Sequence, residues 1–215
     1  FKGNGEKYLL IEFIEGRTLE KYDTTQLNKN EKYIIIFELM LTIQYLHSKE
    51  YICRDMYPEN IMINQNKDAV LIDLDRLIKI NDQKTVDFCR FIRPPELDQG
   101  KLLTYKSDIF ILGYIMYFIL FDKSNKSHNI NDMIIEIQKH SNLKERSILI
   151  ECLNNEPIKR PNISDIIYTF YHNFISKIQY DENKQKIFIL FKDIVKNIKT
   201  KDVTYEHFIQ GDDIE

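Results

Sequence analysis

Three polar side chains stand at a spacing that can hold a metal-bound phosphate. Asn60 follows Asp55 by five residues, and Asp73 follows Asn60 by thirteen. Carboxylate and amide oxygens are the hard ligands that Mg²⁺ prefers, and a carboxylate can also accept a proton from a substrate hydroxyl. The three residues therefore point to phosphate chemistry that depends on a divalent cation.

The elements on either side of these residues predict how they are positioned. Short apolar runs occupy residues 61–63, just after Asn60, and residues 70–72, just before Asp73. The polar stretch between them is typical of a turn, so the two runs predict a β-hairpin. Such a hairpin places Asn60 at one strand end and Asp73 near the other, where both can face one ligand.

The remaining sequence predicts a mainly helical protein. The apolar run at residues 8–13 predicts a buried strand, and residues 29–48 have the period of an amphipathic helix. Residues 81–101 show no clear period. Further helices are expected at residues 107–121, 131–140, 144–154, 163–178 and 181–199.

The segment 53–60 resembles the catalytic loop of eukaryotic protein kinases, H-R-D-x-x-x-x-N, and Asp73 stands at the first position of D-F-G. The agreeing residues are Arg54, Asp55, Pro58, Glu59, Asn60 and Asp73. The resemblance implies an α+β, protein-kinase-like fold. It would have a mainly helical large lobe with a short catalytic β-hairpin, and its small N-terminal lobe would be largely missing.

The same resemblance divides the chain into three parts. Residues 1–13 would be the last strands of the small lobe, residues 14–178 the large lobe, and residues 179–215 a C-terminal helical extension or linker. Because the first residue is Phe rather than Met, we expect a piece of a longer protein. That piece alone is expected to be inactive, since it lacks the lobe that covers the nucleotide.

The resemblance also implies a role for each residue of the loop. Asp55 would orient the substrate hydroxyl and accept its proton. Asn60 and Asp73 would bind the Mg²⁺ that accompanies ATP. Arg54 would bind a phosphate on the activation loop, with Thr85 as the residue that carries it.

By resemblance, the ATP base would lie against residues from two segments. Ile11 would stand at the back of the pocket, and the backbone groups of Glu12 and Ile14 would meet adenine. Met62 would pack below the ring, and Asp73 would hold the metal that bridges the phosphates.

Four residues far from the loop agree with the same family. Glu96 matches the glutamate that ends the activation segment, and Arg160 matches the arginine that pairs with it. Asp108 matches the aspartate of the central helix that anchors the backbone of the catalytic loop, and Gly113 matches a glycine of that helix. A buried ion pair must be mutually satisfied, so we expect Glu96 and Arg160 to bind each other.

Four other residues depart from the family pattern. Tyr57 stands where serine/threonine kinases carry a lysine beside the transferred phosphate, and its hydroxyl can donate a hydrogen bond there without a positive charge. Asp75 replaces the glycine of D-F-G and adds a carboxylate near the metal ligands. Cys53 and Leu74 replace a histidine and a phenylalanine, and we expect both to pack in the core.

Composition excludes several classes of function. The net charge of −3 gives no basic surface for nucleic acid. The apolar run at residues 109–121 is shorter than the roughly 20 residues of a membrane span, so it predicts a buried helix. The three cysteines have no metal-ligand spacing. They favour free thiols and an intracellular, cytoplasmic location. The sequence does not determine the oligomeric state.

We predict an ATP-dependent protein kinase that phosphorylates serine or threonine hydroxyls of a protein substrate. One alternative is a pseudokinase that serves as a binding or scaffold module, which Tyr57 and Asp75 favour. A second alternative is a small-molecule kinase of the aminoglycoside- or choline-phosphorylating type, suggested by the acidic pair Asp73 and Asp75. Those enzymes generally have H-G-D rather than R-D, and they lack the set Glu96, Asp108 and Arg160.

Overall fold

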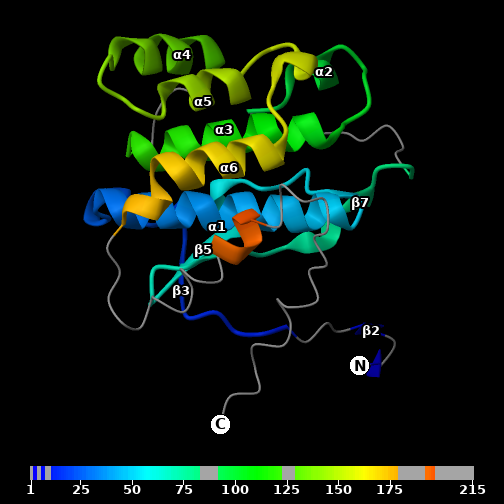
Figure 1. Ribbon diagram of the computed structural model, residues 1–215. Coiled ribbons are helices and arrows are strands. Elements are labelled where there is room, and N and C mark those ends of the chain that lie inside the picture. The colour runs from blue at the N-terminus through cyan, green and yellow to red at the C-terminus, as the bar shows by residue number, and fades with distance from the viewer. Residues whose placement is uncertain are drawn as a thin grey trace.

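The computed structural model describes residues 2–3, 6–7, 11–82, 92–122, 129–178 and 192–196. Figure 1 shows the helices stacked in layers above β3 (Gly16–Thr18) and β5 (Ile61–Asn64), with β7 (Ile78–Lys79) beside the end of α1. Helices α4 (Ile130–Lys139) and α5 (Arg146–Cys152) lie outermost, α3 (Tyr105–Leu120) and α6 (Ile163–Asn173) lie below them, and α1 (Lys29–Ser48) follows. The sheet that contains β3 and β5 therefore lies at one side of a helical body.

Helix α1 begins with a capping box. The Asn28 side chain accepts hydrogen bonds from the backbone N–H groups of Asn30 and Glu31, and the Glu31 carboxylate accepts one from the Asn28 N–H. These bonds satisfy N–H groups that have no partner inside the helix. The helix packs against α3, α6, β4 and β6, so it is buried on more than the single face predicted from its sequence.

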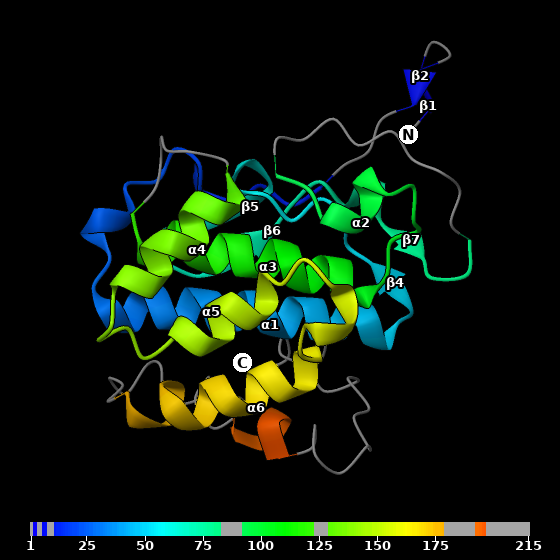
Figure 2. The ribbon, with the colours of Figure 1, turned by 90° about the horizontal axis from the view of Figure 1, so that it is seen from above.

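Helix α3 is the central helix of the protein. Every residue from Ser107 to Ile119 is buried, because α1 covers one side and α5 another (Figures 1 and 2). The contact with α5 depends on Gly113, since a Cβ atom there would lie 2.8 Å from the Cβ of Cys152. A glycine thus lets the two helices approach closely, and the predicted buried helix is confirmed.

An aromatic layer joins α1 to α6. The rings of Tyr33 and Phe170 meet edge to face with centroids 5.6 Å apart, and Tyr33 also contacts Phe174 at 4.9 Å. Aromatic pairs in such arrangements add to the stabilisation that burial itself provides. Figure 2 shows α6 lying along α1.

The predicted hairpin is confirmed. Strands β5 (Ile61–Asn64) and β6 (Ala69–Leu71) pair antiparallel, and β3 (Gly16–Thr18) adds to the other edge of β5. A second small sheet pairs β4 (Tyr51–Ile52) with β7 (Ile78–Lys79), and a third pairs β1 (Lys2–Gly3) with β2 (Glu6–Lys7). The first two sheets flank the segment that carries the predicted site.

Short helical elements fill the connections. These are η1 (Thr24–Gln26), η2 (Pro58–Asn60), η3 (Leu74–Arg76), α2 (Pro95–Asp98), η4 (Pro157–Lys159), η5 (Ile175–Lys177) and a helical turn at residues 192–196.

Two expectations about secondary structure need correction. Of the strand expected at residues 8–13, residues 8–10 lie outside the described residues; residues 11–15 form no strand, and the side chains of Ile11 and Phe13 are 72% and 86% exposed. An apolar run becomes a buried strand only where other strands pair with it, and none of the described strands pairs with residues 11–15. The expected helix 163–178 is interrupted at Phe174, and most of the expected helix 181–199 lies outside the described residues.

Within the described ranges, no helix is both long enough and apolar enough to cross a lipid bilayer.

Candidate active site

Asp108 of α3 holds the backbone that leads into the predicted catalytic loop. Its carboxylate accepts hydrogen bonds from the N–H of Cys53 at 2.8 Å and from the N–H of Arg54 at 3.0 Å. The ring of His47 meets the same carboxylate at 2.8 Å. The backbone at Arg54 has φ +66°, an unfavourable conformation for a residue with a side chain, so this support matters. The expected anchoring role of Asp108 is confirmed.

Asn60 and Asp55 bind each other directly. The Asn60 amide nitrogen donates to the Asp55 carbonyl at 2.9 Å and to the Asp55 carboxylate at 2.8 Å. Both side chains are buried, and η2 fixes the turn between them. Because the nitrogen faces Asp55, the amide oxygen of Asn60 points away from it, and no described residue donates a hydrogen bond to that oxygen. The oxygen is thus a candidate metal ligand.

Asp73 reaches the same place through the hairpin. The N–H of Ile72 donates to the Asn60 carbonyl at 2.8 Å, which sets Asp73 beside the loop. Asp73 has φ +57°, so the left-handed conformation falls on Asp73 and not on Asp75, where the family pattern has its glycine. The nearby Asp75 carboxylate, some loss of hydration, a hydrogen bond with Asp75 and the charge of Asp55 raise the pKa of Asp73, while Arg76 opposes the shift.

These observations test whether the site suits Mg²⁺. Among the described residues, no group of three or more His, Cys, Asp or Glu side chains is placed to hold a metal by itself. Asp73 and Asp75 nevertheless repel each other, and a cation would relieve that repulsion. Together with the amide oxygen of Asn60, this set of oxygen donors fits a hard cation whose other ligands come from phosphate and water.

Arg76 is a site residue that the sequence analysis missed. Its Nε lies 3.4 Å from the Asp55 carboxylate, and its side chain is 45% exposed. Its position only three residues after Asp73 could have indicated that it lies near the site. Arg54 is more enclosed: its Nε is buried without a hydrogen-bond partner, and burial followed by the charge of Arg76 lowers the pKa of its guanidinium.

The expected role of Tyr57 needs correction. Its side chain is 3% exposed, and its hydroxyl donates to the Ile92 carbonyl at 2.6 Å. A phenol has one proton to donate, so this hydroxyl is not directed at a transferred phosphate. Tyr57 instead joins the catalytic loop to the segment that leads into α2.

Leu74 also departs from expectation, whereas Cys53 follows it. Cys53 is buried in the core, as expected. The Leu74 side chain lies in the turn η3, which has no buried residue, and is 49% exposed.

The residues expected to bind the ATP base are only partly brought together. Met62 lines a pocket of about 420 Å³. The other lining residues are Gly16, Arg17, Thr18 and Lys21. Ile11, Glu12 and Ile14 do not line it and lie in the segment without a strand. Thr85, the expected phosphorylation site, lies outside the described residues.

The distant ion pair is confirmed. Two guanidinium nitrogens of Arg160 donate to the two carboxylate oxygens of Glu96, each at 2.8 Å, and Ser107 donates to the same carboxylate at 2.7 Å. The Arg160 guanidinium also lies over the ring of Phe110, 4.8 Å from its centroid. Burial alone would raise the pKa of Glu96, but the hydrogen bonds from Arg160 and Ser107 lower it. The charge is thus fully paired inside the protein.

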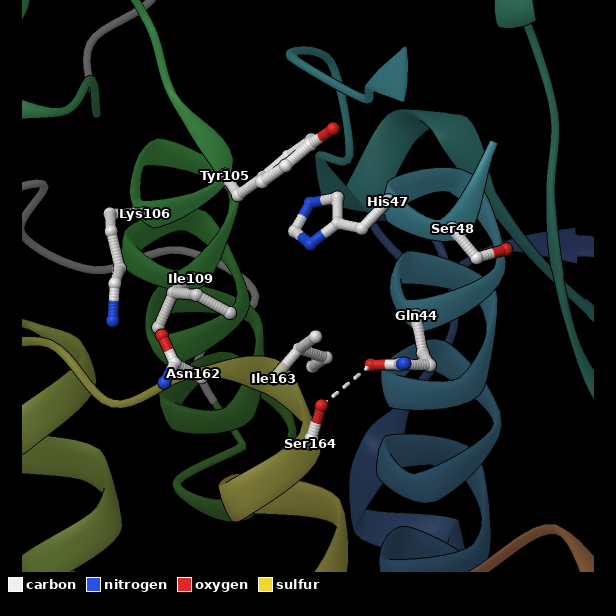
Figure 3. A pocket seen from close by; sticks show the side chains of 9 residues that line it. All are labelled: Gln44, His47, Ser48, Tyr105, Lys106, Ile109, Asn162, Ile163 and Ser164. Carbon is white, nitrogen blue, oxygen red and sulfur yellow. Dashed lines mark hydrogen bonds between the residues drawn. The ribbon is translucent and has the colours of Figure 1, made fainter. Parts of the chain in front are cut away.

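A second pocket, of about 230 Å³, lies between α1, α3 and the start of α6 (Figure 3). None of the predicted site residues lines it. Two of its polar side chains bind within the protein: Ser164 donates to Gln44 at 3.5 Å, and the Lys106 amine donates to the Arg160 carbonyl at 2.5 Å. This pocket is therefore a junction between helices that lies apart from the phosphate chemistry.

Comparisons with known proteins extend these findings. A family model described as "Protein kinase domain" matches residues 1–177. The serine/threonine-protein kinase D of Synechocystis sp. is 26% identical over 192 residues, which cover 82% of this chain and 37% of that protein. An Aurora kinase of Dictyostelium discoideum is 24% identical over 172 residues, 74% of this chain and 45% of that protein. The serine/threonine-protein kinase Nek8 of Danio rerio is 25% identical over 181 residues, which cover 75% of this chain and 26% of that protein. The chain thus spans less than half the length of these relatives.

Proposed function

The chain belongs to the protein kinase family, and we propose that it carries the catalytic residues for transfer of the γ-phosphoryl group of ATP to serine or threonine hydroxyls of proteins. The observation that carries the proposal is the cluster of Asp55, Asn60 and Asp73. The Asn60 amide binds Asp55 at 2.8 Å, and the backbone next to Asp73 binds Asn60 at 2.8 Å.

In the proposed reaction, Asp55 orients the acceptor hydroxyl and takes its proton. The hydroxyl oxygen forms a bond to the γ-phosphorus, the bond from that phosphorus to the β–γ bridging oxygen breaks, and ADP leaves with those electrons. Bound Mg²⁺, held by Asn60 and Asp73, would neutralise phosphate charge. Asn60 has a further role in this scheme, because its hydrogen bonds fix the orientation of the Asp55 carboxylate.

The choice of serine and threonine rests on the catalytic loop and on the relatives. The loop has Pro58, Glu59 and Asn60 after Asp55, and the matched relatives include proteins named as serine/threonine-protein kinases. Protein substrates are proposed on the same ground.

The division of the chain and its location are also proposals. Residues 14–178 would form the large lobe, residues 1–13 the last small-lobe strands, and residues 179–215 an extension. Cys53 and Cys152 are buried free thiols, which supports an intracellular, cytoplasmic protein.

The test uses the complete natural protein, purified with and without the substitution Asp55→Asn. We expect wild type to transfer labelled phosphate from Mg-ATP to serine- and threonine-containing peptides, and the variant to lose at least about a thousandfold in rate. Binding of Mg-ATP and the melting temperature should change little, because the amide oxygen of the introduced asparagine can still accept a hydrogen bond. Equal inactivity of both proteins would contradict the proposal.

One observation favours the pseudokinase alternative. Asp75 places a second carboxylate against Asp73, and the pKa of Asp73 is raised chiefly for that reason. Extra negative charge at this point weakens phosphate binding wherever no cation compensates it. Nucleotide binding without phosphate transfer in the complete protein would support this alternative.

A further inference from the structure

Phosphoryl transfer in this site lacks one positive charge. Charge builds up on the oxygens of the transferred group, and catalysis depends on cations placed to neutralise it. Tyr57 stands in the loop where the family pattern has a lysine. Its side chain is buried, and its hydroxyl donates a hydrogen bond to the Ile92 carbonyl. A cation that replaces this lysine would therefore have to come from another segment.

Arg76 is held where such a charge is required. On one side, the Ile72 N–H binds the Asn60 carbonyl at 2.8 Å. On the other side, β7 pairs with β4, which runs directly into the catalytic loop (Figure 2). The short turn η3 between these two attachments cannot move far, so the backbone of Arg76 stays beside Asp55.

The side chain of Arg76 forms an ion pair with one acidic group of the site, and its charge acts on a second. Its Nε lies 3.4 Å from the Asp55 carboxylate, and its charge acts on Asp73 against the larger effect of Asp75. No described residue other than Asp55 forms a hydrogen bond or ion pair with its guanidinium. A planar guanidinium with open N–H groups suits the oxygens of a phosphate.

Arg54, the other arginine near Asp55, is poorly placed for this role. It is buried, its backbone is bound to Asp108, and its conformation is left-handed. The Arg76 side chain, by contrast, is 45% exposed and its ion pair with Asp55 is loose, at 3.4 Å. Partly exposed ion pairs contribute little free energy, so a phosphate with more charge can draw the guanidinium away from Asp55.

We propose that Arg76 binds the γ-phosphoryl group and supplies the positive charge that Tyr57 does not provide. This inference rests on the proposed function, because it concerns the same site. When Arg76 turns to the phosphate it also releases the Asp55 carboxylate, which then accepts the proton of the acceptor hydroxyl. In this proposal, the cation that binds the phosphate belongs to the turn after Asp73, and not to the catalytic loop.

The test compares Arg76→Ala and Arg76→Lys in the complete natural protein. Arg93→Ala is the matched control, because Arg93 is also 45% exposed and ion-paired, with Asp98 as its partner. We expect Arg76→Ala to lower kcat about a hundredfold and Arg76→Lys to retain most of it.

Calorimetric affinities for Mg-ATP and Mg-ADP give a readout that does not depend on turnover. If Arg76 contacts the γ-phosphoryl group, Arg76→Ala should bring the two dissociation constants closer together, and Arg93→Ala should not. An increased rate in Arg76→Ala would show that Arg76 restrains Asp55, and would overturn the inference. So would an unchanged ratio of the two affinities.

The two proposals can fail separately. If wild type binds Mg-ATP without transferring phosphate, the proposed function fails, while the ratio of affinities still decides the role of Arg76. If wild type transfers phosphate and Arg76→Ala does so equally well, only the inference about Arg76 fails. A wild type that binds no nucleotide overturns both.

Discussion

Two regions of the molecule differ in how their charged groups are paired. We call Glu96, Ser107, Asp108 and Arg160, which hold the loop from the helices, the support. We call Asp73, Asp75 and Arg76, which would meet phosphate, the phosphate face. In the support, the carboxylates of Asp108 and Glu96 are buried and paired: Asp108 binds two backbone N–H groups, and Glu96 binds Arg160 and Ser107. At the phosphate face, Asp73 and Asp75 repel each other and Arg76 is loosely held. The support thus pairs these charges within the protein, whereas the phosphate face has carboxylates whose charge is not compensated.

This difference shows where a ligand can contribute free energy. Buried charges that already have partners, such as those of Asp108 and Glu96, gain little from a ligand, whereas uncompensated charge makes binding of the opposite charge favourable. The support should therefore govern stability, and the phosphate face should govern binding and rate. Three substitutions test that division.

The largest effect is expected in the support. Arg160→Ala leaves the buried Glu96 carboxylate without its main partner, so the free energy of unfolding should fall by about 3–5 kcal/mol. Urea denaturation followed by circular dichroism measures it. The control is Lys159→Ala, which breaks an exposed pair with Glu156 and should cost less than about 1 kcal/mol. If both substitutions lowered the free energy of unfolding by similar amounts, the ion pair of Glu96 and Arg160 would not stabilise the protein more than an exposed pair does.

A smaller effect is expected where the two regions meet. Tyr57→Phe removes the hydroxyl that donates to the Ile92 carbonyl, and the loss of one buried hydrogen bond should cost about 1 kcal/mol of stability. Steady-state rates should change by less than about tenfold, because the hydroxyl does not face the phosphate. A hundredfold loss of kcat with an unchanged melting temperature would instead restore Tyr57 as a catalytic donor.

The smallest effect is expected at the phosphate face. Because Asp75 raises the pKa of Asp73 above its ordinary value of 3.8, the folded protein holds that proton more tightly than the unfolded chain does. The free energy of unfolding should therefore fall as pH rises from 3.8 through the raised pKa. Asp75→Asn should lessen that fall.

Melting temperatures recorded without Mg²⁺ from about pH 3 to about pH 7 check this expectation. The variant Asp82→Asn controls for the loss of one surface carboxylate. A pH profile unaltered by Asp75→Asn would show that the two carboxylates do not interact in solution.

Local sequence pattern predicted most of the fold. The hairpin that carries Asn60 and the helices α1 and α3 follow from apolar runs and their periods, because those signals are contained within each segment. The roles of Asp108 and of the pair Glu96 and Arg160 came from the family resemblance, and the hydrogen bonds bear them out.

The errors occurred where the outcome depends on packing between segments. The run that includes Ile11 and Phe13 is apolar enough for a strand, yet burial requires partner strands, which a local pattern cannot report. The burial of Tyr57 depends on the carbonyl of Ile92, thirty-five residues away. The ion pair of Arg76 depends on how the turn η3 is set between two strand pairings. None of these was visible in the residue's own neighbourhood.

The way in which Asp108 holds the loop has a consequence for evolution. Its carboxylate binds the N–H groups of Cys53 and Arg54, which any residue other than proline supplies. These hydrogen bonds therefore remain when either side chain is replaced, and the backbone of the loop can keep its conformation while its sequence changes. A cysteine at position 53 and a tyrosine at position 57 show how far such a loop can diverge while Asp55 and Asn60 keep their places.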